Sequence, residues 1–562
     1  MNGPEPGPAS PSADARARRT FFRIGVASLL VVTAVLLVAS LVRNDGHLLY
    51  VIDDAGIHLS LAHQLVTHGT WGPYPGHYAS ASSSPGWTLL LAGLSLGHTG
   101  LLQILPVALN VAAGIWIVWL FARHQDYLLP GGRRWAGYVL IAVLPVVLWF
   151  LPALAMVGME HALHAALVVQ ALVLLAGLQT GRLTARRCWP FVAVIALASL
   201  VRYESAFLAA GCAAGIVLAA TSRFANEATR ANSRVRASLA LAAATTAAAA
   251  LPITIFGFVN KAFGDGFLPN SVTAKALVGR SAPLVPSLDA TMRALQQDGM
   301  VLVPALAAAA YLIWAWFGGP RANVALATAF LVTAILHASY ANFHYFERYQ
   351  AYLVIAGSFV LLRLAPEVVP RARKPAALAF ALVVVIALST ARINATHDAP
   401  LAMSNTYRQR YQLARFFAAY YKGRAIGTDE LGYPSLLHEG PIVDPLGLGT
   451  HPFLVEMLRH RVPRAAFVDA YFRRHDVQAV AIYPGNALGF EVPKSWLLVG
   501  EWRLGERNVS GFEKVLAFYA RDERMAEELD RNLRAFAHRL PSDVSTVDRT
   551  AIVDRFLRGS HP

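Results

Sequence analysis

Long apolar runs separated by short polar loops fill the first 392 residues of the chain. The first run covers 21–42, and as a helix it would measure about 33 Å, enough to cross a bilayer. Further runs lie at 85–98, 101–122, 136–152, 159–178, 189–201, 204–220, 237–258, 299–317, 322–340, 348–365 and 375–392. The pattern predicts a polytopic α-helical membrane domain over 21–392.

Charges between the runs predict the topology. Residues 1–20 are rich in Pro, Ala, Ser and Gly and end in a group of arginines, which predicts a disordered cytoplasmic tail. Basic residues also cluster in the loops 123–134, 182–187, 223–236 and 371–374. The positive-inside rule places all four in the cytoplasm if the short run 85–98 is re-entrant or interfacial. We therefore expect about eleven crossings. The outer face then holds the loops 43–84, 259–298 and 341–347, the junctions 158–160 and 202–204, and everything after 393.

Residues 393–562 lose the long apolar runs and alternate short strand-like and helix-like stretches. Strands are expected at 424–428, 441–444, 477–483, 496–501 and 514–519, and helices at 453–459, 464–474 and near 522–540. This predicts an extracytoplasmic α/β domain at the C-terminal end of the chain.

Composition agrees with a membrane protein. The 562 residues are 56% hydrophobic and 15% charged, with mean hydropathy +0.44, whereas soluble domains carry about 25% charged residues. The net charge of +15 comes from arginines at the ends of apolar runs, a topology signal that argues against nucleic acid as a partner. Cys188 and Cys212 lie at or inside apolar segments, which excludes a disulfide framework.

The first outer loop holds the most conspicuous polar group, the adjacent carboxylates Asp53 and Asp54. Two carboxylates beside a membrane are costly unless they are paired or used. Asp53 could instead cap the helix that follows, with Asp54 favoured by its dipole. His58, one turn after Asp54, could orient Asp54 or a substrate hydroxyl. The spacing of the neighbouring histidines is poor for a shared metal.

Five blocks along the chain resemble the GT-C glycosyltransferases, which use polyprenyl-phosphate sugars outside the membrane. They are the Asp53-Asp54 segment with Ser84-Pro85-Gly86-Trp87, Gly158-Met159-Glu160, Arg202-Tyr203-Glu204, Leu268-Pro269-Asn270-Ser271 with Lys275, and Asp444-Pro445-Leu446-Gly447-Leu448. Within this superfamily the chain resembles the mycobacterial terminal arabinofuranosyltransferases, which use decaprenyl-phosphate arabinose. It departs from them at 341–348, where relatives often have Gly-Gly-Asp.

The resemblance implies a GT-C-like fold and an inverting transfer of a sugar, plausibly arabinofuranose, to a cell-envelope glycan. Asp53 would be the base, with Asp54 as helper, and the pair could hold a divalent cation (Mg, Mn or Ca). Lys275, Arg202 and Arg348 would bind the donor phosphate. The other substrate-binding candidates are His58, Trp87, Glu160, Glu204, Asn270 and Glu347.

Several of these residues could instead have a purely structural role. Lys275 could be an interfacial lysine that snorkels, Arg202 could form only a structural ion pair with Glu204, and Glu160 could cap a helix or pair with an arginine. The turn-rich, aromatic loop 69–87 suits a saccharide but is also ordinary for an interfacial loop.

The expected location is the bacterial inner membrane, and the expected partners are the lipid-linked donor, a glycan acceptor and membrane lipids. Alternatives are a protein or lipid acceptor, as in O-mannosyl transfer or lipid A decoration, or a flippase or transporter. A transporter should place its ionisable residues near the midplane and show repeated halves. This chain shows neither feature.

Overall fold

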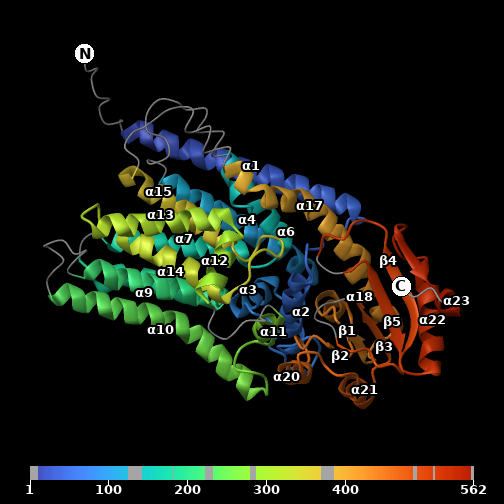
Figure 1. The fold of residues 1–562 in the computed structure, drawn as a ribbon. Coiled ribbons are helices and arrows are strands. Elements are labelled where there is room, and N and C mark those ends of the chain that lie inside the picture. The colour runs from blue at the N-terminus through green and yellow to red at the C-terminus, as the bar shows by residue number, and fades with distance from the viewer. Residues whose placement is uncertain are drawn as a thin grey trace.

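The computed structural model describes residues 11–124, 142–179, 182–221, 232–278, 287–368, 385–484, 490–510 and 513–557. A bundle of long helices and a sheet-containing domain lie end to end (Figure 1). The bundle contains α1 (Pro11–Arg43), α2 (Asp53–His68), α3 (Pro85–Ser95), α4 (Thr99–Arg123), the π-helical turn η2 (Leu144–Leu148), α6 (Leu151–Val157), α7 (His161–Leu178), α8 (Ala185–Val201), α9 (Ser205–Ala220), α10 (Asn232–Ala262), α11 (Asn270–Val278), α12 (Leu288–Gln296), α13 (Gly299–Trp316), α14 (Val324–Tyr340) and α15 (Ala351–Val368).

The chain then continues through α17 (Thr390–Thr406), the π-helical turn η4 (Tyr407–Tyr411), α18 (Gln412–Tyr420), β1 (Ile426–Thr428), α19 (Gly432–Leu437), β2 (Ile442–Val443), α20 (His451–His460), α21 (Ala465–Arg474), β3 (Ala479–Ile482), β4 (Leu497–Leu504), β5 (Val515–Ala520), α22 (Glu523–Ala537), β6 (Val544–Val547) and α23 (Arg549–Leu557). The predicted fold class, a helical membrane domain followed by an α/β domain, is confirmed.

Among the described residues, five helices are long and apolar enough to cross a bilayer: Ala15–Arg43 of α1, α4, α7, Ser233–Ala262 of α10, and α13. Three further helices, α9, α14 and Ala351–Ala365 of α15, are apolar but shorter. At 11 residues, α3 is about 16 Å long, which is too short to cross, as expected for 85–98. The number of crossings stays a prediction. Most of the basic loops 123–134, 223–236 and 371–374, and parts of the runs 136–152 and 375–392, lie outside the described residues.

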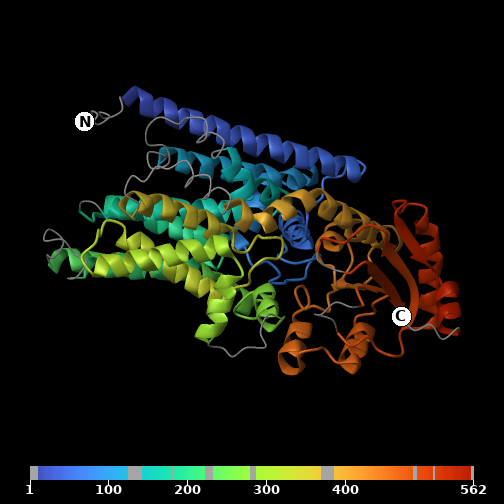
Figure 2. The same ribbon diagram turned by 45° about the horizontal axis from the view of Figure 1, so that its top comes forward.

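Small residues allow close helix contacts in the bundle. On α9, a Cβ at Gly211 or Gly215 would collide with the backbone oxygens of Ala329 and Ala325 on α14. Membrane helices use small residues in this way because lipid supplies no hydrophobic drive for their association. At the other edge, α1 runs along the bundle beside α17 (Figure 2).

Two predicted boundaries differ from the structure. The expected tail 1–20 is helical from Pro11 onward, because alanines and arginines in this stretch are good helix formers. Residue 393, the predicted domain boundary, lies inside α17, which passes through η4 directly into α18. The two domains are therefore joined by nearly continuous helix.

The C-terminal domain is built on a six-stranded sheet in the order β2-β1-β3-β5-β4-β6. β2, β1 and β3 are parallel, and β5, β4 and β6 extend the sheet antiparallel. Side chains of β3 alternate between two cores. Ala479 and Ala481 join the core that includes α18 and α22, whereas Val480 and Ile482 join that of α20 and α21. β3 is thus buried on both faces, as period-two alternation requires.

Candidate functional site

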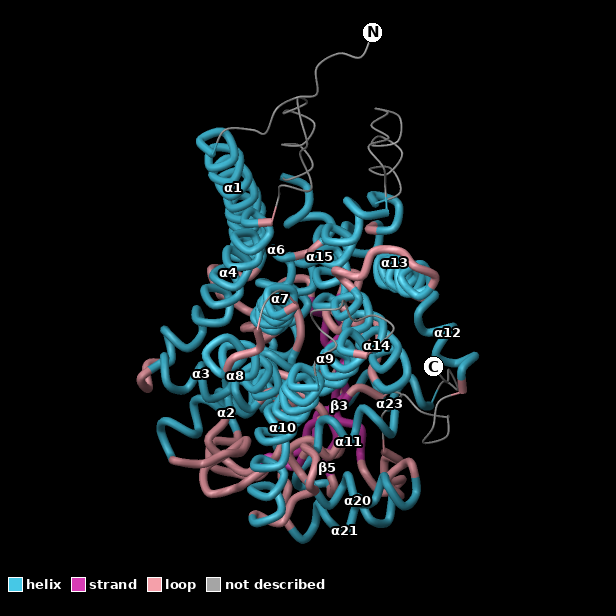
Figure 3. Tube along the Cα trace, turned by 90° about the vertical axis from the view of Figure 1, so that its left-hand side faces the viewer, coloured by secondary structure: helices cyan, strands magenta, loops and turns pink. Residues whose placement is uncertain are grey.

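The predicted site residues gather where the bundle meets the C-terminal domain. In the view along the bundle, α2 and α3 lie on one side of α10, and α11, α20 and the strands lie on the other (Figure 3). α2 packs on α3 and α19. A Cβ at Gly56 would lie 3.0 Å from the carbonyl carbon of Gly432, so the first turn of α19 lies directly against α2.

Asp53 is a cap, but for a different helix from the one its sequence position suggests. α2 has Ile52 at its N-cap, with no side-chain cap bond. The Asp53 carboxylate instead accepts the backbone N–H groups of Gly432 (2.8 Å) and Tyr433 (3.3 Å), at the start of α19. Burial raises the pKa of Asp53, while the nearby Arg410 guanidinium opposes the rise.

Asp54 and Arg348 form an ion pair beside this cap. Arg348 Nη2 lies 2.5 Å from Asp54 Oδ2, and the side chains are 0% and 25% exposed respectively. The guanidinium lies over the rings of Tyr345 and Tyr349, 4.4 and 4.8 Å from their centroids. Its Nε and Nη1 atoms are buried and have no hydrogen-bond partner among the residues that the structure describes. A buried guanidinium with free donors beside a partly exposed carboxylate is unusual, because buried donors are normally satisfied.

The loop before Arg348 has a rare backbone. His344, Tyr345, Phe346 and Glu347 all adopt left-handed φ angles, from 45° to 66°. Each such non-glycine residue costs roughly 1 kcal/mol or more, and strain of this kind clusters at functional sites. The turn replaces the start of the helix expected at 348, which begins only at Ala351.

Glu347 holds this turn together. Its carboxylate lies 3.0 Å from His344 Nδ1 and accepts a hydrogen bond from Gln350 Nε2 at 2.9 Å. On its other side, Arg392 lies 3.6 Å away and is paired with the buried Asp298. These contacts support a structural role for Glu347, and its predicted substrate-binding role stays a prediction.

A second ionic cluster contains three further candidates, Arg202, Glu160 and Glu204. Arg202 Nη1 donates to Glu160 Oε1 at 2.5 Å, while Nε (3.1 Å) and Nη2 donate to Glu204. All three guanidinium nitrogens therefore face carboxylates, and a phosphate would have to displace one of them. Ser84 also donates to Glu160, at 2.6 Å. The geometry favours the structural ion-pair reading of Arg202.

His58 and Trp87 lie between the two clusters. His58 Nδ1 is 2.9 Å from Thr88 Oγ1, and its Nε2 is 3.9 Å from Glu160 Oε2. Trp87 is fully buried in the apolar core around α2 and α3. Both side chains contact the interior, and whether either touches a substrate stays a prediction.

Asn270 joins three segments of the outer end. Its Nδ2 donates to Asp265 (3.2 Å) and its Oδ1 lies 2.9 Å from His451 Nδ1. Asp265 in turn accepts two hydrogen bonds from Ser80, both at 2.7 Å. Asn270 therefore ties the loop after α10 to the first outer loop and to α20. Lys275 is on α11, but its side chain lies outside the described residues.

Asp444 organises its own motif. Its carboxylate accepts the backbone N–H groups of Leu446 and Gly449, both at 2.8 Å. Gly447 has φ 76° and no room for a Cβ against Leu454. This explains the Asp-x-x-Gly spacing as a loop that seats α20, and the nearby Leu448 carbonyl accepts a hydrogen bond from Asn270.

We expect the stability of the chain to depend on pH through Asp444. Burial raises its pKa to about 6 from 3.8, so the protonated form stabilises the fold, and this contribution is lost as pH rises from 4 to 7. The loss should be about 1–3 kcal/mol. Thermal unfolding of wild type and Asp444→Asn across this range measures it, and identical pH profiles for the two proteins would refute the assignment.

Residues that the sequence analysis missed complete the neighbourhood of Asp53. Arg410 on η4 donates to Glu430 Oε1 at 2.8 Å and to Ser510 Oγ at 3.0 Å. Arg410 and Glu430 are both buried, and burial raises the pKa of Glu430. The signal was available in Asp429-Glu430, an acidic pair just after the predicted strand 424–428, since carboxyl ends of parallel strands commonly border sites.

The structure does not offer a clear set of ligands for the divalent cation expected at Asp53 and Asp54. Within the described ranges, no group of three or more His, Cys, Asp or Glu side chains is placed to hold a metal. The oxygens of Asp53 already accept backbone N–H groups, and Asp54 faces Arg348. The present arrangement does not fit a metal held by the two aspartates, and we derive no chemistry from one.

Comparisons with known proteins find one family model over part of the chain and solved structures of low similarity. Residues 401–520 match a family described as "Domain of unknown function (DUF8728)", and no curated protein matches the chain. Among solved structures, ArnT from Cupriavidus metallidurans bound to undecaprenyl phosphate is 14% identical, with TM-score 0.48, and the match covers 88% of this chain and 98% of that one.

An oligosaccharyltransferase from Archaeoglobus fulgidus, tethered with an acceptor peptide, is 13% identical to this chain, with TM-score 0.44. That match covers 92% of this chain and 75% of the other. ArnT and this oligosaccharyltransferase are members of the GT-C superfamily. The narrower resemblance to mycobacterial arabinofuranosyltransferases stays a prediction.

Proposed function

We propose that the chain is an inverting glycosyltransferase that moves a sugar from a polyprenyl phosphate to an acceptor at the outer end of the bundle. The observation that carries the proposal is the pair of Asp54 and Arg348. It places a partly exposed carboxylate beside a buried cation that has two unused donors. Glycosyl transfer from a phosphate needs these two groups, a proton acceptor and a cation for the leaving group.

In the proposed reaction, the Asp54 carboxylate takes the proton of the acceptor hydroxyl. The hydroxyl oxygen forms a bond to the anomeric carbon, and the bond from that carbon to the phosphate oxygen breaks. Polyprenyl phosphate leaves with the electron pair, and the free Nε and Nη1 of Arg348 hold it. Arginine suits this role because its guanidinium is always charged and its N–H groups donate to phosphate oxygens.

Asp53 then has a supporting role, although its place in the motif makes it the first candidate for the base. It is 7% exposed, and its carboxylate oxygens accept the backbone N–H groups at the start of α19. Asp54 is the more accessible of the two carboxylates. We assign proton transfer to Asp54 and the positioning of α2 against α19 to Asp53.

We retain a pentofuranose, with arabinofuranose first, as the sugar and a cell-envelope glycan as the acceptor. The five motif blocks between residues 53 and 448 support this choice. The expected setting is the bacterial inner membrane with the site on the outer side, which agrees with the positive-inside pattern of the loops.

A transfer assay tests the proposal. Purified protein in liposomes is offered a panel of polyprenyl-phosphate sugars, each with oligosaccharide, peptide and lipid acceptors, and product is followed by mass spectrometry. We expect transfer from one donor to the oligosaccharide, and a donor KM raised at least tenfold in Arg348→Gln because a charged hydrogen bond is lost. Transfer only to peptide or lipid would overturn the acceptor class. Failure of every donor to bind would overturn the glycosyltransferase itself.

A further inference from the structure

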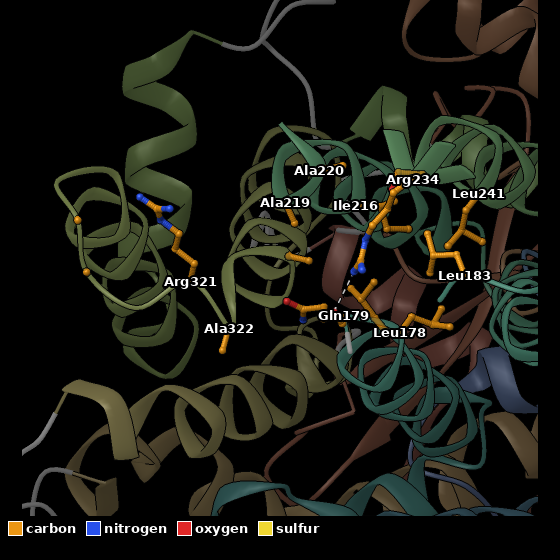
Figure 4. Close-up of a pocket in the computed structure, with 15 residues that line it drawn as sticks. Leu178, Gln179, Leu183, Ile216, Ala219, Ala220, Arg234, Leu241, Arg321 and Ala322 are labelled. Atoms are coloured by element: carbon orange, nitrogen blue, oxygen red, sulfur yellow. Dashed lines mark hydrogen bonds between the residues drawn. The ribbon is translucent and has the colours of Figure 1, made fainter. Parts of the chain in front are cut away.

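A cavity lies at the end of the bundle opposite the Asp54–Arg348 pair. Its volume is about 660 Å³, and it lies between the last turns of α7 and α9, the first turns of α10, and the connection from α13 to α14 (Figure 4). Pockets of this size commonly hold small molecules. The cavity shares no lining residue with the proposed transferase site, so its function has to be found from its own chemistry.

The polar lining of this cavity consists of hydrogen-bond donors. Arg234 reaches in from α10 and donates to the backbone oxygen of Gln179 at 3.1 Å. The buried Nε2 of Gln179 has no hydrogen-bond partner within the described ranges. Arg321 comes from the turn before α14, and it has no hydrogen-bond or ion-pair partner within the described part of the chain. The described lining contains no carboxylate. Such a set of donors selects an anion.

The remaining walls are apolar. Leu175, Leu178, Ile216 and Leu241 face the cavity. A smaller cavity of about 280 Å³ adjoins it and shares Ala220 and Ser238, and its other walls are Val217, Thr221, Val235 and Leu239. The second space runs between α9 and α10, where Leu239 is 52% exposed. The ligand thus meets donors at one end and a hydrocarbon surface at the other.

Exposed tryptophans place this cavity at the level of the membrane surface. Trp189 near the start of α8 and Trp314 and Trp316 at the end of α13 are 64%, 41% and 44% exposed. Tryptophan side chains exposed at the ends of membrane helices lie at the head-group level. Because α13 ends only five residues before Arg321, the donors of the cavity lie at the same depth.

We infer that this cavity binds the phosphate head group of an anionic membrane phospholipid, with one acyl chain along α9 and α10. Arg234 and the Gln179 amide donate to the phosphate oxygens, and the positive charge of Arg321, which lies on the other side of the cavity (Figure 4), adds to the attraction for the anion. The apolar walls and the adjoining space take the glycerol and the start of the chain. Basic pockets between membrane helices bind lipid head groups through the same combination of charge and apolar surface.

Lipid binding to the full chain tests this inference. The protein is purified in neutral detergent and exposed to vesicles of phosphatidylcholine alone or with phosphatidylglycerol. Retained lipid is then measured by native mass spectrometry and thermal unfolding is recorded. We expect phosphatidylglycerol to bind and to raise the unfolding midpoint. Binding should weaken by about thirtyfold in the Arg234→Gln/Arg321→Gln double variant, given the attraction of each arginine to anionic lipid.

Matched controls separate this site from diffuse attraction and from a soluble anion. Arg236→Gln removes an exposed charge from the same helix outside the cavity, and its binding should stay within twofold. Arg321→Gln alone removes a side chain without partners, so it should weaken binding and leave the folded protein unchanged. Equal binding of phosphatidylcholine, equal loss in Arg236→Gln, or an equal thermal shift with inorganic phosphate alone would each overturn the inference.

Discussion

Asparagine in place of Asp54 is expected to lower kcat by about 100- to 10,000-fold, the usual contribution of a positioned general base. The change keeps the shape of the side chain and removes its proton acceptor. It also leaves the buried Arg348 without a charged partner, since the two groups are 2.5 Å apart. Donor binding should persist, because the free donors of Arg348 remain. Steady-state kinetics with the active donor, together with donor binding, measures both effects.

Two variants serve as controls for this experiment. Asp398→Asn breaks another aspartate–arginine pair, with Arg507 at 2.6 Å. This pair is exposed and is not part of the proposed site, so the variant should change kcat by less than twofold. Asp53→Asn should reduce stability as well as activity, because it disturbs the cap on α19. If Asp53→Asn stays folded and loses all turnover while Asp54→Asn retains most of it, the base is Asp53.

The second large effect is expected from Gly432→Ala. A Cβ at this position would collide with the backbone oxygen and carboxylate of Asp53, and neither group can move without shifting α2. Overpacking of this kind costs about 1–3 kcal/mol. The N–H groups that hold Asp53 would also be displaced, so kcat should fall together with the unfolding midpoint.

Gly93→Ala on α3 is the matched control, because no atom lies within 4 Å of its Cβ position. It should leave kcat unchanged and should not lower the unfolding midpoint, because alanine favours a helix more than glycine does. Normal stability and activity in Gly432→Ala would mean that the contact between α2 and α19 is not needed for the site.

Local patterns predicted most of the fold. Apolar runs located most of the long helices described in the bundle, and period-two alternation located five of the six strands. β6 was missed because its two central residues, Ser545 and Thr546, are both polar and exposed, so the strand has no alternation of apolar and polar residues. The left-handed turn at 344–347 was missed for a different reason. Tertiary contacts of Glu347 and Arg348 hold it, and no glycine marks it in the sequence.

The site was predictable only in part. Asp54 and Arg348 were found, from the acidic doublet and from family resemblance respectively, but their contact joins residues 294 positions apart. Local patterns do not predict such pairs. Arg202 was misleading because its cationic character is visible in the sequence, whereas its saturation by Glu160 and Glu204 requires coordinates. Arg410 was overlooked because an arginine on an amphipathic helix usually faces water.

The contact between Asp53 and Gly432 has a consequence for biogenesis. The two residues are 379 positions apart, and at about 5–20 residues per second a ribosome needs roughly 20 to 80 s to make the intervening chain. Throughout this interval the acidic start of α2 is without its partner. The site therefore assembles near the end of synthesis, and a nascent chain stalled before α19 would be inserted in the membrane yet inactive.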